Sequence, residues 1–258
     1  MTTLHSLGSG SKGNCFALEE DGVILLLDAG FSAREIGRRA ALAGLDLSRL
    51  CAIVVTHEHG DHASGAVQLA RQRGVPILAS PGTWSALKGA EGLRHVPLRA
   101  GEPAEAGNFR IAAAATNHDA AEPMALAVWG PSGIRVGLAH DLGRPTAAVR
   151  YLLRELSVLV IEANHDEILL RTSEYPAAVR QRIAGGGGHL SNRAAAELME
   201  ELVHPHLEHV VLAHLSERCN TPAEARATIT PTLARAGFRG VLHVAMQNEA
   251  MRVEVRGS

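Results

Sequence analysis

A polar segment rich in potential metal ligands follows directly after an apolar run, and it constrains this chain more than any other feature. Residues 52–56 (AIVVT) predict a buried strand, and residues 57–62 read HEHGDH. Four ligands on one loop cannot all reach a single ion, but His57 with His59 can bind one metal while Asp61 with His62 bind a second. Imidazole and carboxylate together suit zinc, iron or manganese. The segment therefore predicts two neighbouring divalent ions.

Two ions roughly 3.5–4 Å apart can hold the attacking and leaving oxygens of a hydrolytic displacement, so hydrolysis is the leading reaction class. A polar surface turn is the competing interpretation of a His-rich stretch. A dinuclear site needs more ligands than this loop provides, and later strand ends offer three. They are His118, Asp141 and His214, which follow the apolar runs 111–115, 136–139 and 210–213. Taken singly, each could also be an ordinary polar residue at a strand end.

A short Asp28-Ala29-Gly30 element closes the predicted strand over residues 23–27. A buried carboxylate at this point can hydrogen-bond the metal loop and hold its imidazoles in one tautomer, as groups behind metal ligands usually do. An Asp that begins a helix is the alternative. We expect Asp28 to support the ligands without binding metal.

The H-x-H-x-D-H pattern at a strand end, together with the D-x-G element, resembles the metallo-β-lactamase-fold hydrolases. Four further blocks are similar to the YycJ/WalJ branch of that fold, and the match covers nearly the whole chain. These blocks are GSGSKGN (8–14), IEANHD (161–166), GHLSN (188–192) and LAHLS (212–216). The resemblance implies a four-layer αββα sandwich, which we expect to form one catalytic domain over residues 1–258. It also implies 5′-to-3′ exonuclease activity on DNA, in repair or processing, with two divalent ions (zinc or manganese).

The resemblance also implies roles for individual residues. His118 would complete the first metal site, Asp141 would bridge both ions, and His214 would complete the second. Asp61 counts both as a ligand and as a catalytic residue. By a further similarity to ribonuclease Z, Glu162 and His189 look like a carboxylate-histidine pair that passes a proton to the leaving oxygen. Phosphodiester cleavage expels an alkoxide, and a positioned imidazole can supply that proton; His189 could instead simply precede a helix.

Substrate contacts are predicted from weaker signals. The opening loop over residues 9–14 could form an anion-binding nest in which Ser11 and Asn14 contact phosphate, although a flexible turn has the same composition. His165 is a candidate substrate contact or a residue behind the ligands. Aromatic rings could stack on bases and arginines could contact phosphates, with core packing and solvent exposure as the competing explanations. The candidates are Phe31, Trp84, Tyr175, Arg34, Arg144, Arg180 and Arg193.

Composition limits the partners of this chain. Its 258 residues are 46% hydrophobic, enough for one sizeable core. The net charge is -2 and the basic residues are scattered, so we expect a small DNA contact without a basic clamp. Three cysteines without paired metal spacing favour reduced thiols. No targeting segment or membrane span is apparent, and we expect a cytoplasmic protein of undetermined oligomeric state.

Alternating strand and helix patterns favour an α/β layered architecture. Capping boxes at Ser32–Glu35 and Thr221–Glu224 mark two helix starts, the first helix ending near Gly44. Predicted strands cover residues 15–18, 23–27, 52–55, 76–79, 110–115, 125–129, 135–139, 158–161 and 209–213. Further predicted helices cover residues 64–73, 146–156, 175–183, 192–202 and 221–236. Strand alternation would point His140 away from Asp141.

Two other functions compete with a nuclease. A hydrolase of a small cyclic phosphodiester, lactone or thioester would use the same dinuclear site, and a metal-binding scaffold would use no chemistry at all. The near-complete ligand set argues against the scaffold. Glu162 and His189 favour phosphodiester cleavage, because ester and thioester leaving groups need less protonation than a sugar alkoxide.

Overall fold

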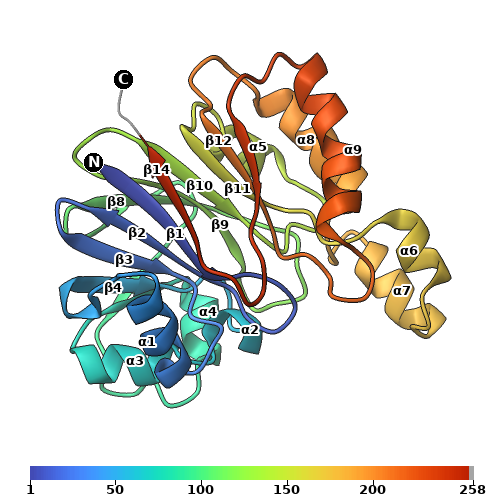
Figure 1. The fold of residues 1–258 in the computed structure, drawn as a ribbon. Helices are drawn as coiled ribbons and strands as arrows, with labels where there is room; N and C mark the ends of the chain where they lie inside the picture. The colour runs from blue at the N-terminus through green and yellow to red at the C-terminus, as the bar shows by residue number, and fades with distance from the viewer. Residues whose placement is uncertain (256–258) are drawn as a thin grey trace.

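The computed structural model describes residues 1–255, which form two seven-stranded sheets packed face to face (Figure 1). The first sheet has the order β14-β1-β2-β3-β4-β5-β6. Its strands are β1 (Thr2–Gly8), β2 (Cys15–Glu20), β3 (Val23–Leu27), β4 (Leu50–Val54), β5 (Ile77–Ala79), β6 (His95–Pro97) and β14 (Met251–Val255). The four strands β3 to β6 run parallel to one another, whereas β14, β1, β2 and β3 pair antiparallel.

The second sheet has the order β13-β12-β11-β10-β9-β8-β7. Its strands are β7 (Ala104–Ala106), β8 (Phe109–Ala115), β9 (Met124–Trp129), β10 (Arg135–Ala139), β11 (Val158–Glu162), β12 (His209–Ala213) and β13 (Val241–Val244). Strands β10 to β13 are parallel, and the antiparallel hairpin β8–β9 joins them through β9. Strand β8 therefore points the same way as β10, β11 and β12.

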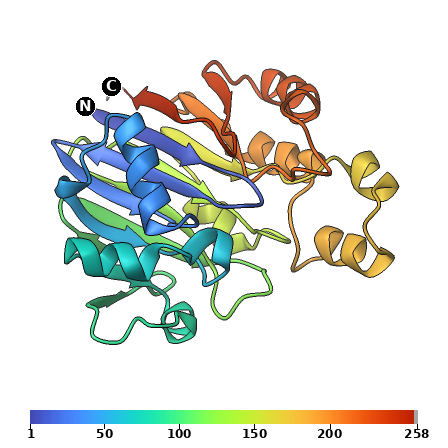
Figure 2. The same ribbon diagram turned by 60° about the horizontal axis from the view of Figure 1, so that its bottom comes forward.

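Helices cover the outer face of each sheet, so the predicted four-layer αββα sandwich is confirmed (Figures 1 and 2). On the first sheet lie α1 (Ala33–Leu42) and α3 (Ala66–Arg73). On the second lie α5 (Ala147–Leu152), α8 (Asn192–Leu202) and α9 (Pro222–Arg235). The shorter helices are η1 (Leu47–Arg49), α2 (Gly60–Ala63), α4 (Pro81–Ala86), α6 (Glu167–Thr172) and α7 (Ala177–Ala184).

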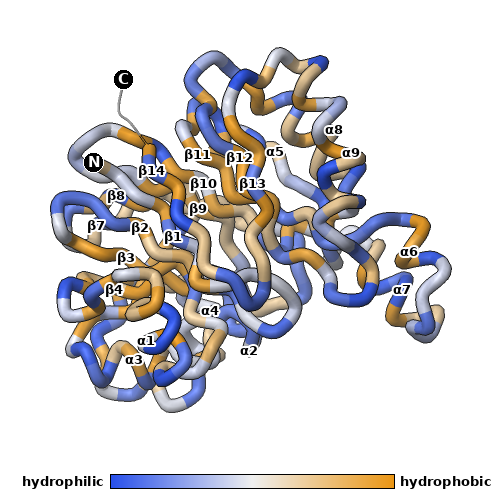
Figure 3. The backbone as a smooth tube through the Cα atoms, viewed as in Figure 1, coloured by the Kyte–Doolittle hydropathy of each residue, from blue (hydrophilic) through white to orange (hydrophobic). Residues whose placement is uncertain are grey.

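Three apolar clusters hold these layers together. The central one lies between the sheets and joins residues such as Phe16 and Val54 to Phe109 and Val160. The other two lie between each sheet and its helices, which explains why many strands are apolar on both faces. Figure 3 shows this arrangement as hydrophobic strands inside more hydrophilic outer segments.

Helices α6 and α7 project away from the sandwich, at the right of Figures 1 and 2. They form an excursion between β11 and α8, on the same side of the molecule as the ends of β11 and β12. Helix α7 is tied back by its Arg182, whose guanidinium pairs with Asp119 at 2.6 Å. This excursion therefore lies next to the loop that follows β8 and contains Asp119.

The predicted capping residues begin both helices, although they do not form complete capping boxes. The Ser32 hydroxyl accepts from the Glu35 amide and the Thr221 hydroxyl accepts from the Glu224 amide. The Glu35 carboxylate, however, binds Arg38 and Arg39 rather than the amide of its capping residue. Helix α1 ends at Leu42, and Gly44 has a φ of 74°, as expected after a helix end.

Some predicted elements need correction. Helix α5 ends at Leu152 rather than near residue 156, because Glu155 has a φ of 55° and turns the chain out of the helix. The N-terminal segment, for which no strand was predicted, is the buried strand β1, paired between β14 and β2. Strands β6, β7, β13 and β14 and helices α4 and α6 had not been predicted. Within residues 1–255, no helix combines the length and the apolar character needed to cross a membrane.

Candidate metal centre

The polar side chains predicted at strand ends converge at one edge of the sandwich. Strands β8, β10, β11 and β12 are followed or ended by His118, Asp141, Glu162 and His214, respectively. Because these strands point the same way, their carboxyl ends meet at a common edge. Strand β4 of the other sheet ends at the metal loop over residues 57–62, which faces them. The site therefore lies at the seam between the two sheets.

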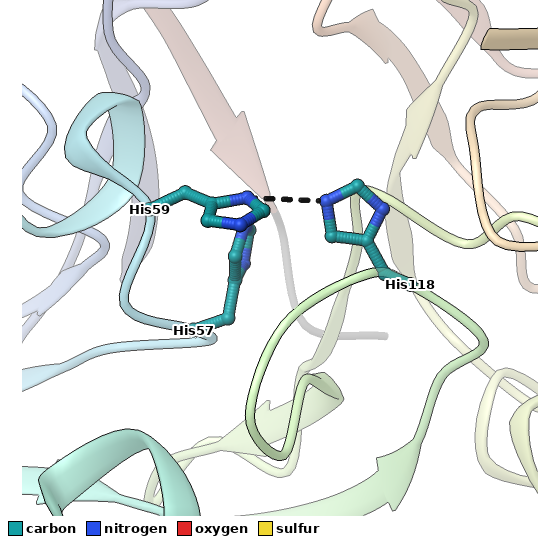
Figure 4. Close-up of side chains that lie close together, drawn as sticks. All are labelled: His57, His59 and His118. Carbon is teal, nitrogen blue, oxygen red and sulfur yellow. Dashed lines mark hydrogen bonds between the residues drawn. The ribbon is translucent and has the colours of Figure 1, made fainter. Parts of the chain in front are cut away.

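Three histidines form the first cluster, shown in Figure 4. Ring nitrogens of His57, His59 and His118 lie within 4.8 Å of one another. His118 Nε2 and His59 Nδ1 lie 3.3 Å apart. The other nitrogen of His118 lies 3.3 Å from the Gly188 carbonyl oxygen, to which it donates if protonated. This leaves Nε2 of His118 facing the cluster.

The second cluster contains Asp61, His62 and His214. Asp61 and His62 lie on α2, the one-turn helix that follows His59. Asp61 Oδ2 lies 3.4 Å from His62 Nε2 and 3.2 Å from His214 Nε2. The two ligand pairs expected on the loop fall in different clusters, although His57 and His62 also share a third group with Asp141.

Asp141 lies between the clusters, and its contacts fit a bridging ligand. Its Oδ2 is 3.5 Å from His57 Nε2 and 2.9 Å from His62 Nε2, one residue from each cluster. Both carboxylate oxygens and His57 Nε2 are buried, and although histidine nitrogens lie as close as 2.8 and 2.9 Å to the two oxygens, none of the three atoms has a well-aligned hydrogen bond among the described residues. Buried polar atoms without partners are costly unless something else binds them. The donor set, three imidazoles on one side and a carboxylate with two imidazoles on the other, suits divalent metals.

Asp28 lies behind the ligands, fully buried at the end of β3. Its Oδ2 is 2.7 Å from His62 Nδ1, and its carboxylate also accepts from the Thr56 amide at 2.8 Å and the Thr56 hydroxyl at 3.0 Å. A proton held on Nδ1 by this carboxylate leaves Nε2 of His62 free to bind an ion. The geometry agrees with the predicted supporting position.

Backbone strain is concentrated at the same strand ends. Asp28, Asp141 and His214 have φ values of 61°, 49° and 54°, in the left-handed region that residues with a Cβ rarely adopt. Each of these residues directly follows, or lies one residue beyond, a parallel strand. Strained residues of this kind persist only where the surrounding structure holds them, and they are common at functional sites.

The predicted pair of Glu162 and His189 forms beside the ligands. Glu162 is fully buried; its Oε1 is 2.7 Å from His189 Nδ1, and its Oε2 accepts from the Leu142 and Leu190 amides. His189 Nδ1 is also 2.8 Å from Asp141 Oδ1. With Nδ1 engaged, Nε2 is the nitrogen of His189 that remains for a substrate atom.

Charge and burial set the protonation of these groups. Burial raises the pKa of Glu162, but the charge and hydrogen bond of His189 outweigh it and bring the pKa to about 2. For His189, burial lowers the pKa, but Glu162 and Asp141 raise it well above the usual value. Burial lowers the pKa of His57 well below its usual value, which favours the neutral form that binds metal.

The opening loop over residues 9–14 connects the metal loop to His214 through hydrogen bonds. The amide of Asn14, which is fully buried, contacts the Asp61 carbonyl at 3.4 Å and His62 Nε2 at 3.3 Å. The Ser9 hydroxyl accepts from the His214 amide and donates to Asn14 Oδ1. Asn14 therefore holds the metal loop, and a substrate contact by Asn14 remains a prediction. Ser11 is exposed and lines the cavity over the centre, as a substrate contact would.

That cavity has a volume of about 240 Å³, and five of the seven candidate metal ligands line it: His59, Asp61, His118, Asp141 and His214. Tyr175 and Arg182, from the α6–α7 excursion, form part of its wall. Phe31 is not available for base stacking, because its ring is buried beneath the Arg39 guanidinium, 4.0 Å from the ring centroid. The Trp84 ring stacks on His95.

Several supporting residues were not identified from the sequence. Asn164 donates to the His214 carbonyl oxygen at 3.0 Å, and Thr56 binds both Asp28 and His57 Nδ1. Their positions just after β4 and β11 were the sequence signal that could have identified them. His140 is buried, with neither ring nitrogen hydrogen-bonded among the described residues, and its Nδ1 lies 3.9 Å from Asp28 Oδ2. His165 is buried away from the 240 Å³ cavity and lines a neighbouring one.

Comparison with known proteins agrees with this architecture. The profile of the Beta-lactamase superfamily domain matches residues 24–215. Exodeoxyribonuclease YycJ of Bacillus anthracis is 32% identical over 238 residues, covering 90% of this chain and 89% of that protein. Exodeoxyribonuclease WalJ of Streptococcus pneumoniae (strain D39) is 33% identical over 237 residues, covering 89% and 87%.

Among solved structures, the metallo-beta-lactamase fold protein YhfI of Bacillus subtilis superposes with a TM-score of 0.70 at 16% identity. That match covers 98% of this chain and 100% of YhfI, and it supports the fold alone. The profile match over residues 24–215 and the identity to YycJ and WalJ show membership of a family as well as a shared fold. This chain belongs to the metallo-β-lactamase superfamily and, within it, to the YycJ/WalJ branch.

Proposed function

We propose that this chain is a two-metal phosphodiesterase that removes nucleotides from the 5′ end of DNA, with residues 1–258 acting as one catalytic domain. The observation that carries the proposal is the Glu162–His189 pair, joined at 2.7 Å directly beside the metal-ligand clusters. Esters and thioesters have little need of such a proton donor. The naming of the YycJ and WalJ relatives as exodeoxyribonucleases supports DNA as the substrate.

The ligand clusters suit two zinc or manganese ions. His57, His59 and His118 would hold one ion, and Asp61, His62 and His214 the other, with Asp141 shared between them. Bound ions would supply positive charge that activates water and stabilises the charge developing on the reacting phosphate. Because Asp141, Glu162, His189 and His214 also lie within ligand distance of one another, metal analysis must separate ligands from the proton donor.

Two residues of the chain, His189 and Glu162, deliver the proton to the leaving oxygen. As a water oxygen bonds to phosphorus, the bond from phosphorus to the 3′ oxygen of the departing nucleotide breaks. His189 Nε2 donates a proton to that oxygen, so that a 3′-hydroxyl leaves and the remaining strand keeps a 5′-phosphate. Glu162 accepts from Nδ1, fixing the ring and favouring its protonated form. The proton lost by water passes to solvent.

Hydrolysis of end-labelled DNA and RNA by metal-free protein, with zinc, manganese or magnesium restored in turn, tests this proposal. A generic thioester and a lactone serve as competing substrates. We expect metal-dependent release of nucleotides from DNA and little turnover of the other two. Efficient thioester or lactone turnover without nuclease activity would overturn the proposal in favour of a small-substrate hydrolase.

A further inference from the structure

A second cavity, larger than the first, lies beside the metal centre and has a volume of about 680 Å³. Its walls come from the loop after β10, from helices α6, α7 and α8, and from the glycine-rich segment before His189. His189 lines both this cavity and the one over the metal ligands. We call it the arginine cavity, after the residues described next.

The arginine cavity carries an excess of positive charge. Its lining contains five arginines and three glutamates: Arg144, Arg150, Arg171, Arg180, Arg193, Glu167, Glu197 and Glu201. Arg150 pairs with Glu201, and Arg193 pairs with Glu167 and Glu197. Within residues 1–255, neither Arg144 nor Arg171 forms a salt bridge. Among the same residues Arg180 forms no salt bridge either, but its guanidinium donates to the Ser173 and Tyr175 carbonyl oxygens. Arg144 and Arg171 therefore remain for an anionic ligand, in a chain of net charge -2.

A buried histidine provides a second, independent indication of a ligand. His165 lines the arginine cavity and is only 2% exposed. Its Nδ1 is buried and has no hydrogen-bond partner among the described residues. A buried polar atom without a partner costs free energy, so it is an expected contact for a ligand that enters the cavity.

We propose that the arginine cavity receives the 5′-terminal nucleotide of the DNA, with Arg144 and Arg171 binding its terminal phosphate. The inference rests on the proposed function, in which His189 protonates the 3′ oxygen of the nucleotide that leaves. That nucleotide must then lie on the His189 side of the reacting phosphate. The arginine cavity is on this side, because His189 forms part of its wall.

The size and charge of the arginine cavity agree with this occupant. A volume of about 680 Å³ lies within the roughly 300–1,000 Å³ of pockets that enclose a small ligand. Guanidinium groups bind phosphate oxygens through two parallel hydrogen bonds, which suits a terminal phosphate with several free oxygens. A strand that ends in this cavity places the first phosphodiester bond at the metal centre, which explains cleavage from an end.

Binding measurements test the cavity separately from catalysis. Titration calorimetry would compare deoxyadenosine 5′-monophosphate with deoxyadenosine on the metal-loaded protein, for wild type and for the double variant Arg144→Ala/Arg171→Ala. We expect the double variant to lose roughly ten- to a hundredfold in affinity for the monophosphate, since hydrogen bonds to charged groups are lost. Affinity for deoxyadenosine should stay unchanged.

Arg73→Ala is the matched control, because Arg73 is an exposed arginine at the far end of α3 from the metal loop. It should bind the monophosphate as wild type does. Both alanine variants remove exposed arginines, and thermal unfolding would confirm that the double variant is folded. Equal monophosphate affinity in the folded double variant and wild type would overturn the assignment of the arginine cavity.

Kinetics then separates the two proposals. On DNA that carries either a 5′-phosphate or a 5′-hydroxyl, wild type should prefer the phosphate in kcat/KM, and the double variant should lose most of that preference. Hydrolysis of bis(p-nitrophenyl) phosphate, too small to need the arginine cavity, should not change. DNA cleavage with an unchanged end preference would overturn the cavity assignment alone, whereas wild-type protein unable to cleave either phosphodiester would overturn the proposed function.

Discussion

Two buried carboxylates use the same hydrogen bond for different purposes at this centre. Asp28 and Glu162 each lie 2.7 Å from Nδ1 of a histidine, His62 and His189 respectively. In both pairs the carboxylate keeps the proton on Nδ1 and turns Nε2 toward the site. For His62 that nitrogen lies among the candidate metal ligands, 2.9 Å from Asp141 Oδ2, whereas the His189 side chain lines both cavities. Because His189 also lies within ligand distance of Asp141 and His214, position alone does not assign these two roles, and the variants below separate them.

The supporting position of Asp28 leads to a first prediction. Asp28→Asn keeps the size of the side chain but removes the charge that fixes the His62 tautomer, so metal affinity should fall about 10- to 100-fold. Competition titration with a chromophoric chelator would measure this. Asp46→Asn, at an exposed helix cap, is the control and should bind metal normally. Unaltered affinity in Asp28→Asn would show that the carboxylate does not tune the ligand.

Proton transfer and metal binding can be separated at His189 and His214. His189→Ala should retain both ions and bind DNA, yet lose roughly 10²- to 10⁴-fold in turnover, the range usual for general acid catalysis. His214→Ala should instead empty or weaken the second metal site. Elemental analysis of both variants beside their rates gives the comparison.

A DNA analogue with sulfur in place of the leaving oxygen sharpens this test, because a thiolate departs without a proton. The analogue should restore much of the rate of His189→Ala if chemistry limits turnover. Metal loss in His189→Ala together with no recovery on the sulfur substrate would instead make His189 a ligand.

At the scale of single residues, the sequence could predict site residues that follow strand ends, but it could not predict contacts between residues far apart in the chain. The loop over residues 57–62 and the later His118, Asp141 and His214 could be placed together from the sequence, because each follows an apolar strand. The contact of Asn14 with His62 joins residues 48 positions apart and depends on how the opening loop folds back. No local pattern predicts such a contact.

Among the connecting elements, the turn after β3 approaches the metal loop so closely that only glycine fits. A Cβ on Gly30 would overlap the backbone carbonyl of Asp61. The Ala29 amide also bonds the His62 carbonyl at 2.7 Å, so this turn and α2 form one unit. The D-x-G element therefore acts through the backbone as well as through Asp28.

Gly30→Ala should displace α2, reduce metal occupancy and lower the free energy of unfolding by about 1–3 kcal/mol, as overpacking does. Gly37→Ala is the matched control, since a Cβ there meets nothing within 4 Å. In the interior of α1 it should raise the free energy of unfolding by about 0.5–1 kcal/mol. Chemical denaturation and metal analysis would measure both; normal metal content in Gly30→Ala would contradict this account.

Elements with a clear period or cap were predictable, and elements defined by pairing were not. Strands β3, β10 and β12 and helix α8 have the bounds that the sequence predicted. Strand β1 mixes polar Thr2 and Ser6 with apolar residues, yet it is buried because β2 and β14 flank it and helix α1 packs nearby. Its partner β14 lies at the other end of the chain, so the pairing has no local signal.

For the molecule as a whole, the centre is complete only when the two sheets pack together. The first sheet supplies Asp28 and the metal loop, and the second supplies His118, Asp141 and His214. Ions bound across this seam should stabilise the folded state, by about 2.7 kcal/mol when free metal exceeds the dissociation constant a hundredfold. The sandwich itself followed from family resemblance rather than from periodicity, since periodicity cannot distinguish among layered α/β folds.

Metal removal should therefore lower the thermal unfolding temperature of the wild-type protein, and restoring zinc or manganese should reverse this. In Asp141→Ala, which lacks the shared ligand, occupancy at one or both sites should fall sharply and the metal-dependent shift should shrink. Differential scanning calorimetry with and without chelator provides the measurement. A variant that holds two ions as tightly as wild type would refute the bridging position of Asp141.

The most direct test of the central claim is product mapping on a single DNA strand labelled at either its 5′ or its 3′ end, with metal-loaded protein. We predict that the 5′ label is released at once in the smallest products, while the 3′ label remains in fragments that shorten stepwise from the 5′ end. Glu162→Gln should slow both patterns without changing their direction. Degradation strictly from the 3′ end, or no degradation by protein that holds two ions, would contradict the account.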